Sequence, residues 1–190
     1  MEITTPISEE VIRSLHVGQV VEITGSCFTG RDAVHHYLCT GGQSPVDMRG
    51  SVIYHCGPVV VKENGVWVVK AAGPTTSIRE EPYQAEVIRQ LGLRGVIGKG
   101  GMGARTLEAC REYGCTYMHA IGGAAQVLAE VVREVKNVYF LEKFGSPEAI
   151  WHLDVVKFPV VITMDSHGNS LHDEVDTRSR AKFENLLAEL

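Results

Sequence analysis

Four loops of this sequence bring glycine together with hydroxyl groups or a single cation at the ends of predicted strands. They are Thr29-Gly30-Arg31-Asp32, Gly73-Pro74-Thr75-Thr76-Ser77-Ile78-Arg79, Gly98-Lys99-Gly100-Gly101 and Gly122-Gly123-Ala124-Ala125. Glycine lets the backbone approach a ligand closely, and the free amides at the start of a helix point at anions. Each loop alone is typical of a surface turn. Together they predict a site for an anionic ligand.

Three of these loops each offer one cation, and the cations are Arg31, Arg79 and Lys99. A guanidinium group matches the geometry of a carboxylate, so this set indicates a small polycarboxylate ligand rather than a nucleotide. The segment Gly98-Lys99-Gly100 lacks the spacing of a phosphate-binding loop, which argues against ATP.

Three consecutive hydroxyl residues, Thr75, Thr76 and Ser77, follow a predicted strand and a rigid proline. A hydroxyl group beside a cation can take part in proton transfer, which would make Thr75 a candidate for catalysis. A hydroxyl group at this place can equally cap a helix that begins near Arg79. The residues alone leave both interpretations open.

Histidine and cysteine give weaker signals. Arg31 and His35 share a helix face because they are four residues apart, and we expect one of His35 and His36 to face inward. A histidine in this setting is more often structural than catalytic. The five cysteines have irregular spacing and no Cys-x-x-Cys pair, which argues against a disulfide framework and a zinc site. An iron–sulfur cluster held by three of them is only weakly favoured, so we expect no metal site in this chain.

The composition excludes several classes of protein. The chain has 190 residues, of which 44% are hydrophobic and 22% are charged, as in a folded domain. The net charge is -5 and no cluster of Lys or Arg is present, so nucleic-acid binding is not predicted. Apolar runs such as residues 158–164 are too short to span a bilayer. The first residues carry no secretion signal, so we expect a cytoplasmic protein without a membrane anchor.

Apolar periodicity and turn residues divide the chain into two halves. The first half predicts a helix capped by Asp32 and strands at 18–24, 52–56, 59–62 and 66–71. The second half predicts helices at 82–91, 104–113 and 124–135, which alternate with strands at 95–98, 115–121 and 155–164. This alternation favours an α/β fold with a parallel or mixed sheet flanked by helices, in a single domain of residues 1–190. Residues 177–190 predict a C-terminal helix that packs on the domain.

Five motifs occur in a fixed order along the chain. They are Thr29-Gly-Arg-Asp-Ala-Val-His35, Tyr54-His-Cys-Gly-Pro58, Ala72-Gly-Pro-Thr-Thr-Ser-x-Arg79, Ile97-Gly-Lys-Gly-Gly101 and Ile121-Gly-Gly-Ala-Ala125. In this order they resemble the β subunit of class I fumarate hydratase and L-tartrate dehydratase. The similarity covers the core of the chain, from about residue 18 to about residue 168.

The resemblance implies a swivelling β/β/α domain with a mixed sheet or barrel-like core and flanking helices. It also implies an iron–sulfur hydro-lyase whose 4Fe–4S cluster is bound by cysteines of an α part, either a separate α subunit or the other half of a fused chain. The iron would act as a Lewis acid on the carboxylate and hydroxyl of a small dicarboxylate substrate. No cluster ligand is then expected in this chain, and a homodimer of the αβ heterodimer is one assembly that the sequence leaves open.

The resemblance also assigns roles to single residues. Thr75 matches the proposed catalytic base, which acts beside an Asp of the α part, and His35 matches the motif histidine, a catalytic candidate in a supporting role. The cations that hold the substrate carboxylates match Arg31, Arg79 and Lys99, and we add Thr76 and Gly98 to the substrate-binding set. The chain departs from the family pattern after Arg79, where Glu80-Glu81 replaces the usual Met-Asp. This change leaves the local loop geometry and the substrate preference open.

The leading hypothesis is a β subunit that hydrates fumarate reversibly to (S)-malate together with an α subunit. L-tartrate dehydration is the near alternative, since the substrate differs by one hydroxyl group that no single residue here identifies. A non-catalytic carboxylate-binding regulatory module is an alternative from a different class. A free-standing enzyme that carries a cluster on its own cysteines is a third, and it would be brown and contain iron without a partner.

Overall fold

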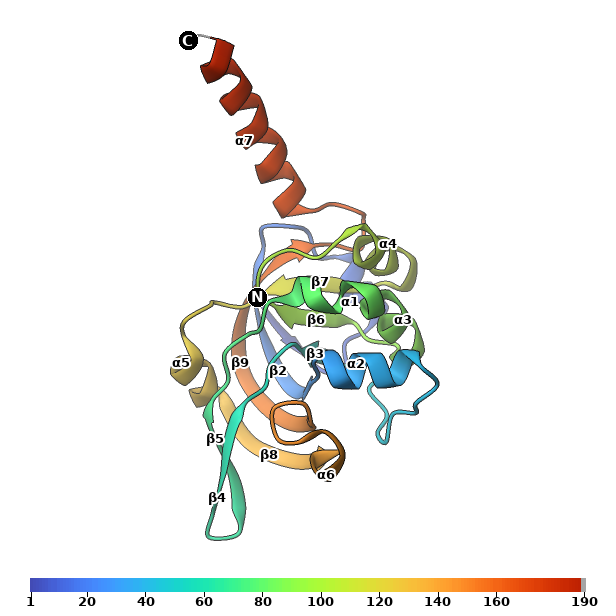
Figure 1. Ribbon diagram of the computed structural model, residues 1–190, viewed down its shortest axis with the longest axis vertical. Helices are drawn as coiled ribbons and strands as arrows, with labels where there is room; N and C mark the ends of the chain where they lie inside the picture. Colours follow the sequence, from blue (N-terminus) through green and yellow to red (C-terminus); the bar gives the residue numbers. More distant parts are fainter. Residues whose placement is uncertain (189–190) are drawn as a thin grey trace.

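A closed five-stranded sheet forms the centre of the computed structural model, which describes residues 1–188 (Figure 1). Four parallel strands, β2, β3, β6 and β7, lie side by side, and β9 runs antiparallel to both β7 and β2. This double pairing of β9 closes the sheet, while β1 and β8 extend it. The strands of this sheet are β1 (Glu2–Thr4), β2 (Val20–Thr29), β3 (Val52–Tyr54), β6 (Gly95–Gly98), β7 (Thr116–His119), β8 (Val132–Tyr139) and β9 (Ile150–Met164). The predicted α/β fold with a mixed, barrel-like core is confirmed.

Three helices cover one outer side of the barrel (Figure 1). Leu38 of α2, Ile88 of α3 and Cys110 of α4 pack in one buried cluster with Ile53 and Val96 of the sheet. Burial of each such side chain stabilises the fold by about 1.5–3 kcal/mol. The helices are α1 (Glu9–Arg13), α2 (Asp32–Cys39), the 3-10 helix η1 (Ser77–Glu80), α3 (Glu81–Leu91), α4 (Ala104–Tyr113), α5 (Ala125–Glu130), α6 (Leu141–Phe144) and α7 (Leu171–Ala188).

The interior of the barrel is a second apolar cluster. Val52 and Tyr54 point into it whereas Ile53 between them faces the helices, as the two-residue period of a strand requires. Ile97 of β6 and Met118 of β7 join the same interior. Because the barrel is filled by side chains, the strands are held rigidly, and the loops that follow them begin from fixed positions.

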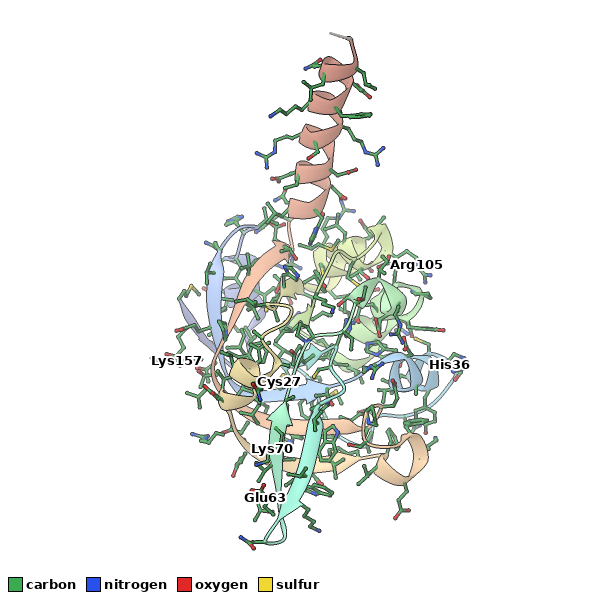
Figure 2. All side chains as sticks on the ribbon, turned by 60° about the vertical axis from the view of Figure 1, so that its left-hand side comes forward. Cys27, His36, Glu63, Lys70, Arg105 and Lys157 are labelled. Carbon is green, nitrogen blue, oxygen red and sulfur yellow. The ribbon has the colours of Figure 1, made fainter. Side chains whose placement is uncertain are left out.

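A hairpin of β4 (Val59–Glu63) and β5 (Val66–Ala71) extends from the barrel (Figure 1). Trp67, two residues after the hairpin turn, packs edge-on against the buried Trp151 with 5.3 Å between ring centroids, which holds the hairpin against the barrel. Figure 2 shows Glu63 and Lys70 on this hairpin, where they form an ion pair of 2.7 Å. The hairpin leads directly into the segment that contains Thr75.

Several predicted elements differ from the structure, and the strands predicted at 18–24 and 155–164 are observed over Val20–Thr29 and Ile150–Met164. The helix predicted over 124–135 ends at Glu130, and β8 follows it. Val132, Val135 and Val138 are spaced by three, which imitates a helix, but irregularities in the β8–β9 register turn all three valines toward the core. The C-terminal helix begins at Leu171 instead of 177, and its predicted residues 189–190 lie outside the described residues. It projects from the body with no buried residue over its described length, so the expectation that it packs on the domain was wrong (Figure 1).

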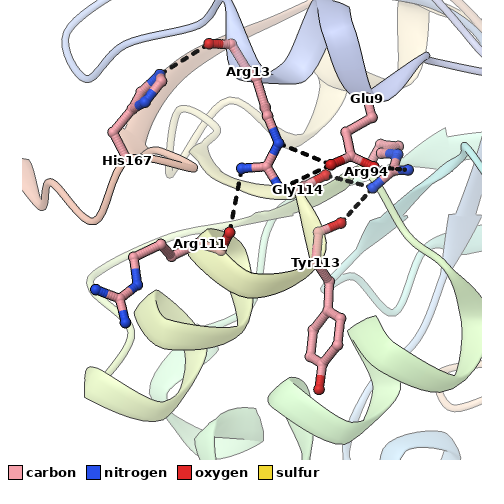
Figure 3. A network of polar contacts seen from close by, with 7 residues as sticks. All are labelled: Glu9, Arg13, Arg94, Arg111, Tyr113, Gly114 and His167. Carbon is pink, nitrogen blue, oxygen red and sulfur yellow. Dashed lines mark hydrogen bonds and ion pairs between the residues drawn. The ribbon is translucent and has the colours of Figure 1, made fainter.

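A network of polar contacts lies at the amino ends of the parallel strands (Figure 3). Arg94, just before β6, donates to the Gly114 carbonyl over 2.9 Å and to the carboxylate of Glu9 over 3.1 Å. Arg13 also donates to Glu9, and His167 forms a hydrogen bond of 2.9 Å to the carbonyl of Arg13. These contacts tie α1, α4 and the end of β9 together at the end opposite to the loops described below. Among residues 1–188, none of the helices has the length and apolar character that a bilayer crossing requires.

Candidate functional site

The loops after β2, β3, β6 and β7 emerge from one end of the barrel because these four strands are parallel. The first residues of the loops are Gly30 and Arg31 after β2, His55 after β3 and Lys99 after β6. In parallel sheets this carboxyl end is the usual place for ligands. Two of the three predicted cations, Arg31 and Lys99, therefore start from β2 and β6, the strands on either side of β3.

The segment from Gly73 to Ser77 crosses this end of the barrel. Both the backbone N–H and the hydroxyl group of Thr75 donate to the carbonyl oxygen of His55, over 2.7 and 3.0 Å. Thr76 forms a parallel bridge with Lys99, and the N–H of Ser77 donates to the Lys99 carbonyl over 3.1 Å. The structure thus brings Thr76 and Ser77, the two residues after Thr75, next to Lys99, although about 20 residues separate them in the sequence.

Gly98 is fixed by this close approach. A Cβ atom at position 98 would collide with the side chain of Ser77 and lie 3.1 Å from the hydroxyl oxygen of Tyr117. Only glycine allows the hydroxyl segment to approach β6 this closely. Gly98 therefore positions the segment, and its predicted contact with substrate stays a prediction.

Arg79 reaches the same end from η1. It forms an ion pair with Asp32, which is the residue after Arg31. Arg31 itself is only partly exposed and lies 3.4 Å from Glu148. Lys99 takes part in no ion pair among the described residues. All three cations thus start from the same end of the barrel, and each arginine holds a carboxylate that an anionic substrate would have to displace.

The predicted helix caps differ from the structure. Asp32 is the first helical residue of α2, and its N-cap is Arg31, which makes no side-chain capping bond. The N–H of Ala33 instead donates to Glu148, over 3.0 Å. At η1 the N-cap Thr76 likewise makes no side-chain capping bond. The capping interpretation of the hydroxyl segment therefore does not hold for Thr76, whose side chain is exposed.

Glu80 and Glu81 have different surroundings. Glu81 accepts hydrogen bonds from the Gly103 N–H over 2.8 Å and from the Thr106 hydroxyl over 2.6 Å, so it caps α4. Glu80 is only 1% exposed, and one of its carboxyl oxygens has no hydrogen-bond partner. Burial raises the pKa of Glu80 to about 7, although the positive charge of Arg79 opposes the shift. The sequence marked both residues as unusual but did not separate a structural carboxylate from a buried, proton-binding one.

His35 and His36 divide as expected, with His35 buried and His36 exposed on the surface of α2 (Figure 2). The Nδ1 atom of His35 lies 2.9 Å from the Arg31 carbonyl oxygen. Both ring nitrogens of His35 have partners inside the protein, since Nε2 contacts Gln84 over 3.0 Å. Burial lowers the pKa of His35, so the neutral imidazole is favoured. This surrounding supports a positioning role for His35 rather than direct proton transfer to a substrate.

Sequence reasoning gave no role to His55 and Gln84. His55 is fully buried, its Nε2 atom lies 2.7 Å from the amide of Gln84, and its Nδ1 atom lies 2.8 Å from the Ser77 hydroxyl oxygen. Burial lowers the pKa of His55 to about 3. His55 belongs to the motif Tyr54-His-Cys-Gly-Pro58, so the motif carried a signal, whereas Gln84 is recognisable only from its position in space.

The cysteines do not form a metal-binding set in the described part of the chain. Residues 1–188 contain no group of three or more His, Cys, Asp or Glu side chains arranged to hold a metal ion. Cys27, Cys56, Cys110 and Cys115 are buried, and Cys39 is half-buried. Burial raises the pKa of the Cys56 thiol to about 12, and it also raises the pKa of Cys27. Burial thus favours the neutral thiol at Cys27 and Cys56.

Known proteins share this sequence over nearly its full length. A family described as "Fumarase C-terminus" matches residues 1–175. A "Putative fumarate hydratase class I" of Geobacillus stearothermophilus is 58% identical over 179 residues, which are 94% of this chain and 34% of that protein. This chain thus spans about one third of the length of that relative.

Two relatives have lengths similar to that of this chain. A "Putative L(+)-tartrate dehydratase subunit beta" of Methanocaldococcus jannaschii is 39% identical over 186 residues, 95% of either chain. The "L(+)-tartrate dehydratase subunit beta" of Escherichia coli (strain K12) is 38% identical over 171 residues, 89% of this chain and 85% of that protein. The fold, the order of the motifs and these matches agree, and the chain belongs to the fumarase C-terminus family.

Proposed function

We propose that this chain is the β subunit of a two-component iron–sulfur hydro-lyase, which hydrates fumarate reversibly to (S)-malate. It supplies the carboxylate-binding cations and the hydroxyl base Thr75 to a site that an α subunit completes. The observation that carries the proposal is the arrival of Arg31, Thr75, Arg79 and Lys99 at one end of the barrel from three separate loops. The "subunit beta" in the names of two relatives supports the α partner.

The cations have a definite task in this reaction. Removing a proton from the carbon next to a carboxylate places negative charge on that carboxylate, and preorganised cations stabilise this charge in the transition state. Arg31 and Arg79 offer forked donors for two carboxylate oxygens, and Lys99 offers a point charge beside Thr75 and Thr76. Such a set binds a dicarboxylate at both ends and fixes its orientation.

Thr75 is the group that exchanges a proton with the substrate carbon in this proposal. Its hydroxyl hydrogen is directed at the His55 carbonyl, and rotation of the hydroxyl group would turn this hydrogen toward a substrate bound at this end of the barrel. In the hydration direction the Thr75 hydroxyl gives its proton to the carbon, and the resulting alkoxide is stabilised by Lys99 and reprotonated through a carboxyl group of the α subunit. The reverse sequence removes the proton during dehydration.

The Lewis acid for the hydroxyl group is assigned to a 4Fe–4S cluster on the α subunit, as the resemblance to the iron–sulfur hydro-lyases implies. Residues 1–188 of this chain bring together no set of three or more metal-ligating side chains. The test is reconstitution. We expect the purified chain alone to be colourless and inactive, and anaerobic mixing with a cluster-loaded α subunit to give malate–fumarate conversion. A correctly assembled but inactive complex would contradict the proposal.

Thr75→Ala separates catalysis from binding. We expect a loss of kcat on the order of 100-fold or more in the reconstituted complex, with substrate affinity retained. Thr40→Ala, which removes an exposed hydroxyl group at the end of α2, serves as the matched control and should leave kcat unchanged. Unchanged turnover in Thr75→Ala would favour a non-catalytic carboxylate-binding module.

L-tartrate dehydration is the second candidate. The observation in its favour is that both relatives of similar length carry tartrate dehydratase names. Comparing kcat/KM for L-tartrate and for malate in the same reconstituted complex decides between the two substrates. A kcat/KM for malate that exceeds the kcat/KM for L-tartrate supports fumarate hydratase activity.

A further inference from the structure

A buried chain of four polar side chains runs beneath the candidate site. It consists of His35 from α2, Gln84 from α3, His55 after β3 and Ser77 from η1, and each of them is 0% exposed. Gln84 is in the middle, within 3.0 Å of Nε2 of His35 and within 2.7 Å of Nε2 of His55. The two imidazoles stand edge to face with 5.1 Å between their centroids. Burying four polar groups is costly unless all of them are paired, so their pairing is informative.

This buried chain of side chains contacts three loops of the site. His35 contacts the Arg31 carbonyl, and the carbonyl of His55 accepts both hydrogen bonds of Thr75. Ser77 contacts Nδ1 of His55 through its hydroxyl group and the Lys99 carbonyl through its N–H. One buried chain therefore contacts the backbone of Arg31 and Lys99 and also holds Thr75.

The hydrogen atoms on these four buried side chains can be assigned from their partners. When Oε1 of Gln84 faces His35, each of the two ring nitrogens of His35 lies next to an oxygen that can only accept a hydrogen bond. Both nitrogens must then carry a hydrogen, which makes the ring a positively charged imidazolium. Both of these partners are uncharged, so they would not stabilise a buried cation. In the same arrangement the Nε2 atom of Gln84 is buried and has no partner.

Turning the Gln84 amide by 180° resolves both problems. Its NH2 group has two hydrogens, and the two imidazoles each offer one Nε2 lone pair. Each ring then carries its hydrogen on Nδ1, where His35 donates to the Arg31 carbonyl and His55 donates to the Ser77 hydroxyl oxygen. The amide oxygen moves to the place without a partner, where an unpaired carbonyl costs less than an unpaired N–H.

We infer that Gln84 is a positioning residue of the proposed site, whose NH2 group holds His35 and His55 as neutral Nδ1–H imidazoles and thereby fixes the backbone of Arg31 and Thr75. The role in catalysis rests on the proposed function, whereas the hydrogen positions do not. A change of Gln84 is expected to displace Arg31 and Thr75 without touching the substrate.

The hydrogen positions are tested by NMR spectroscopy on the full chain labelled with 15N at histidine, with signals assigned by through-bond correlation. We expect His35 and His55 to show a protonated Nδ1 and an unprotonated Nε2 throughout the range from about pH 5 to 8, in which an ordinary histidine titrates. A protonated Nε2 on either residue of the wild-type chain overturns the inference, whether or not the reconstituted complex is active.

Gln84→Glu replaces the amide between the two rings with a carboxylate, which can only accept hydrogen bonds. We expect Nε2 of His35 and of His55 to become protonated, and kcat/KM of the reconstituted complex to fall about 10- to 100-fold. The control is Gln90→Glu, the same substitution on the exposed face of the same helix, which should leave both the histidine spectrum and kcat/KM unchanged.

If Gln84→Glu does not fold, Gln84→Met removes both donors in a side chain of similar length, and we expect a comparable fall in kcat/KM. A folded Gln84 variant with wild-type kcat/KM overturns the positioning role, and an inactive wild-type complex with the expected tautomers counts against the proposed function alone.

Discussion

Arg79 forms an ion pair with Asp32, the residue that directly follows Arg31 in the chain. The contact links η1 to the start of α2 and places the two predicted carboxylate-binding arginines on adjoining segments. Both partners are substantially exposed, so the pair adds little to stability. Its consequence concerns binding, because a substrate carboxylate must compete with Asp32 for Arg79.

Asp32→Asn should therefore improve substrate binding. Removing the competing charge is expected to lower KM of the reconstituted complex about two- to fivefold, with kcat unchanged. Steady-state kinetics measure the effect, and Asp47→Asn, which breaks an exposed pair with Arg49 in the loop before β3, is the control. A KM that rises in Asp32→Asn would show that the aspartate helps to position Arg79 instead.

Glu80 should make stability depend on pH. Its pKa is raised by burial from 4.5 to about 7, so the folded state binds this proton more tightly than the unfolded state. The resulting stabilisation is complete below about pH 4.5 and is lost as the pH rises through about 7. Glu80→Gln, which cannot ionise, should become more stable relative to wild type by roughly 2–3 kcal/mol between about pH 5 and about pH 8.

Urea unfolding of the two full-length chains at both pH values checks this prediction. Glu130→Gln, an exposed residue at the end of α5, is the control and should track the wild type. A difference between Glu80→Gln and wild type that is the same at both pH values would mean that Glu80 does not titrate in this range.

Gly98→Ala should disturb the hydroxyl segment. The added methyl group would collide with the Ser77 side chain, and overpacking of this kind costs about 1–3 kcal/mol. We expect this loss in the free energy of unfolding, and a lower kcat in the reconstituted complex because Thr75 shifts with Ser77. Gly122→Ala is the matched control, since its new Cβ would meet only the Lys99 side chain at an ordinary 3.7 Å. Equal stability of the two variants would contradict the close approach at Gly98.

Removal of the end of α7 should have little effect on the domain. No described residue of α7 is buried, and the helix projects from the barrel (Figure 1). A chain that ends at Asp176 is expected to keep its free energy of unfolding within about 0.5 kcal/mol of wild type. Urea denaturation monitored by tryptophan fluorescence measures this value. A larger loss would show that the helix stabilises the barrel.

Local sequence patterns predicted most single elements and the loops that carry charge. The short strand that ends at Gly98 was readable because a β-branched run stops there at glycine, and a parallel or mixed sheet followed from the alternation of strands and helices. The strand predicted over 18–24 continues to Thr29, past Gly25, which the local pattern did not show. Closure of the barrel was not readable, since β9 pairs with β2 across more than 120 residues and nothing local records that register. β8 was mistaken for part of a helix because its register irregularities give valines a spacing of three.

The candidate site shows the same division. Arg31, Arg79, Lys99 and Thr75 stood out because several loops at predicted strand ends repeat the combination of glycine with a cation or hydroxyl groups, although each loop alone is typical of a surface turn. Gln84 did not, because it sits in an ordinary amphipathic helix, and only the fold brings it between two imidazoles. The roles of Glu80 and Glu81 separated only when burial and partners were known, since neighbouring carboxylates on one turn are equivalent in sequence.

Because β9 pairs with both β2 and β7, the effect of a break in the polypeptide depends on where the break lies. A circular permutant opened at Asn64-Gly65 would interrupt only the exposed tip of the β4–β5 hairpin and leave every barrel strand continuous. One opened within β9 would separate β2 and β7 from their common neighbour in a single step. New termini, inserted domains or fusion partners therefore belong at the hairpin tip, and proteases that nick β9 would be expected to destroy the domain rather than trim it.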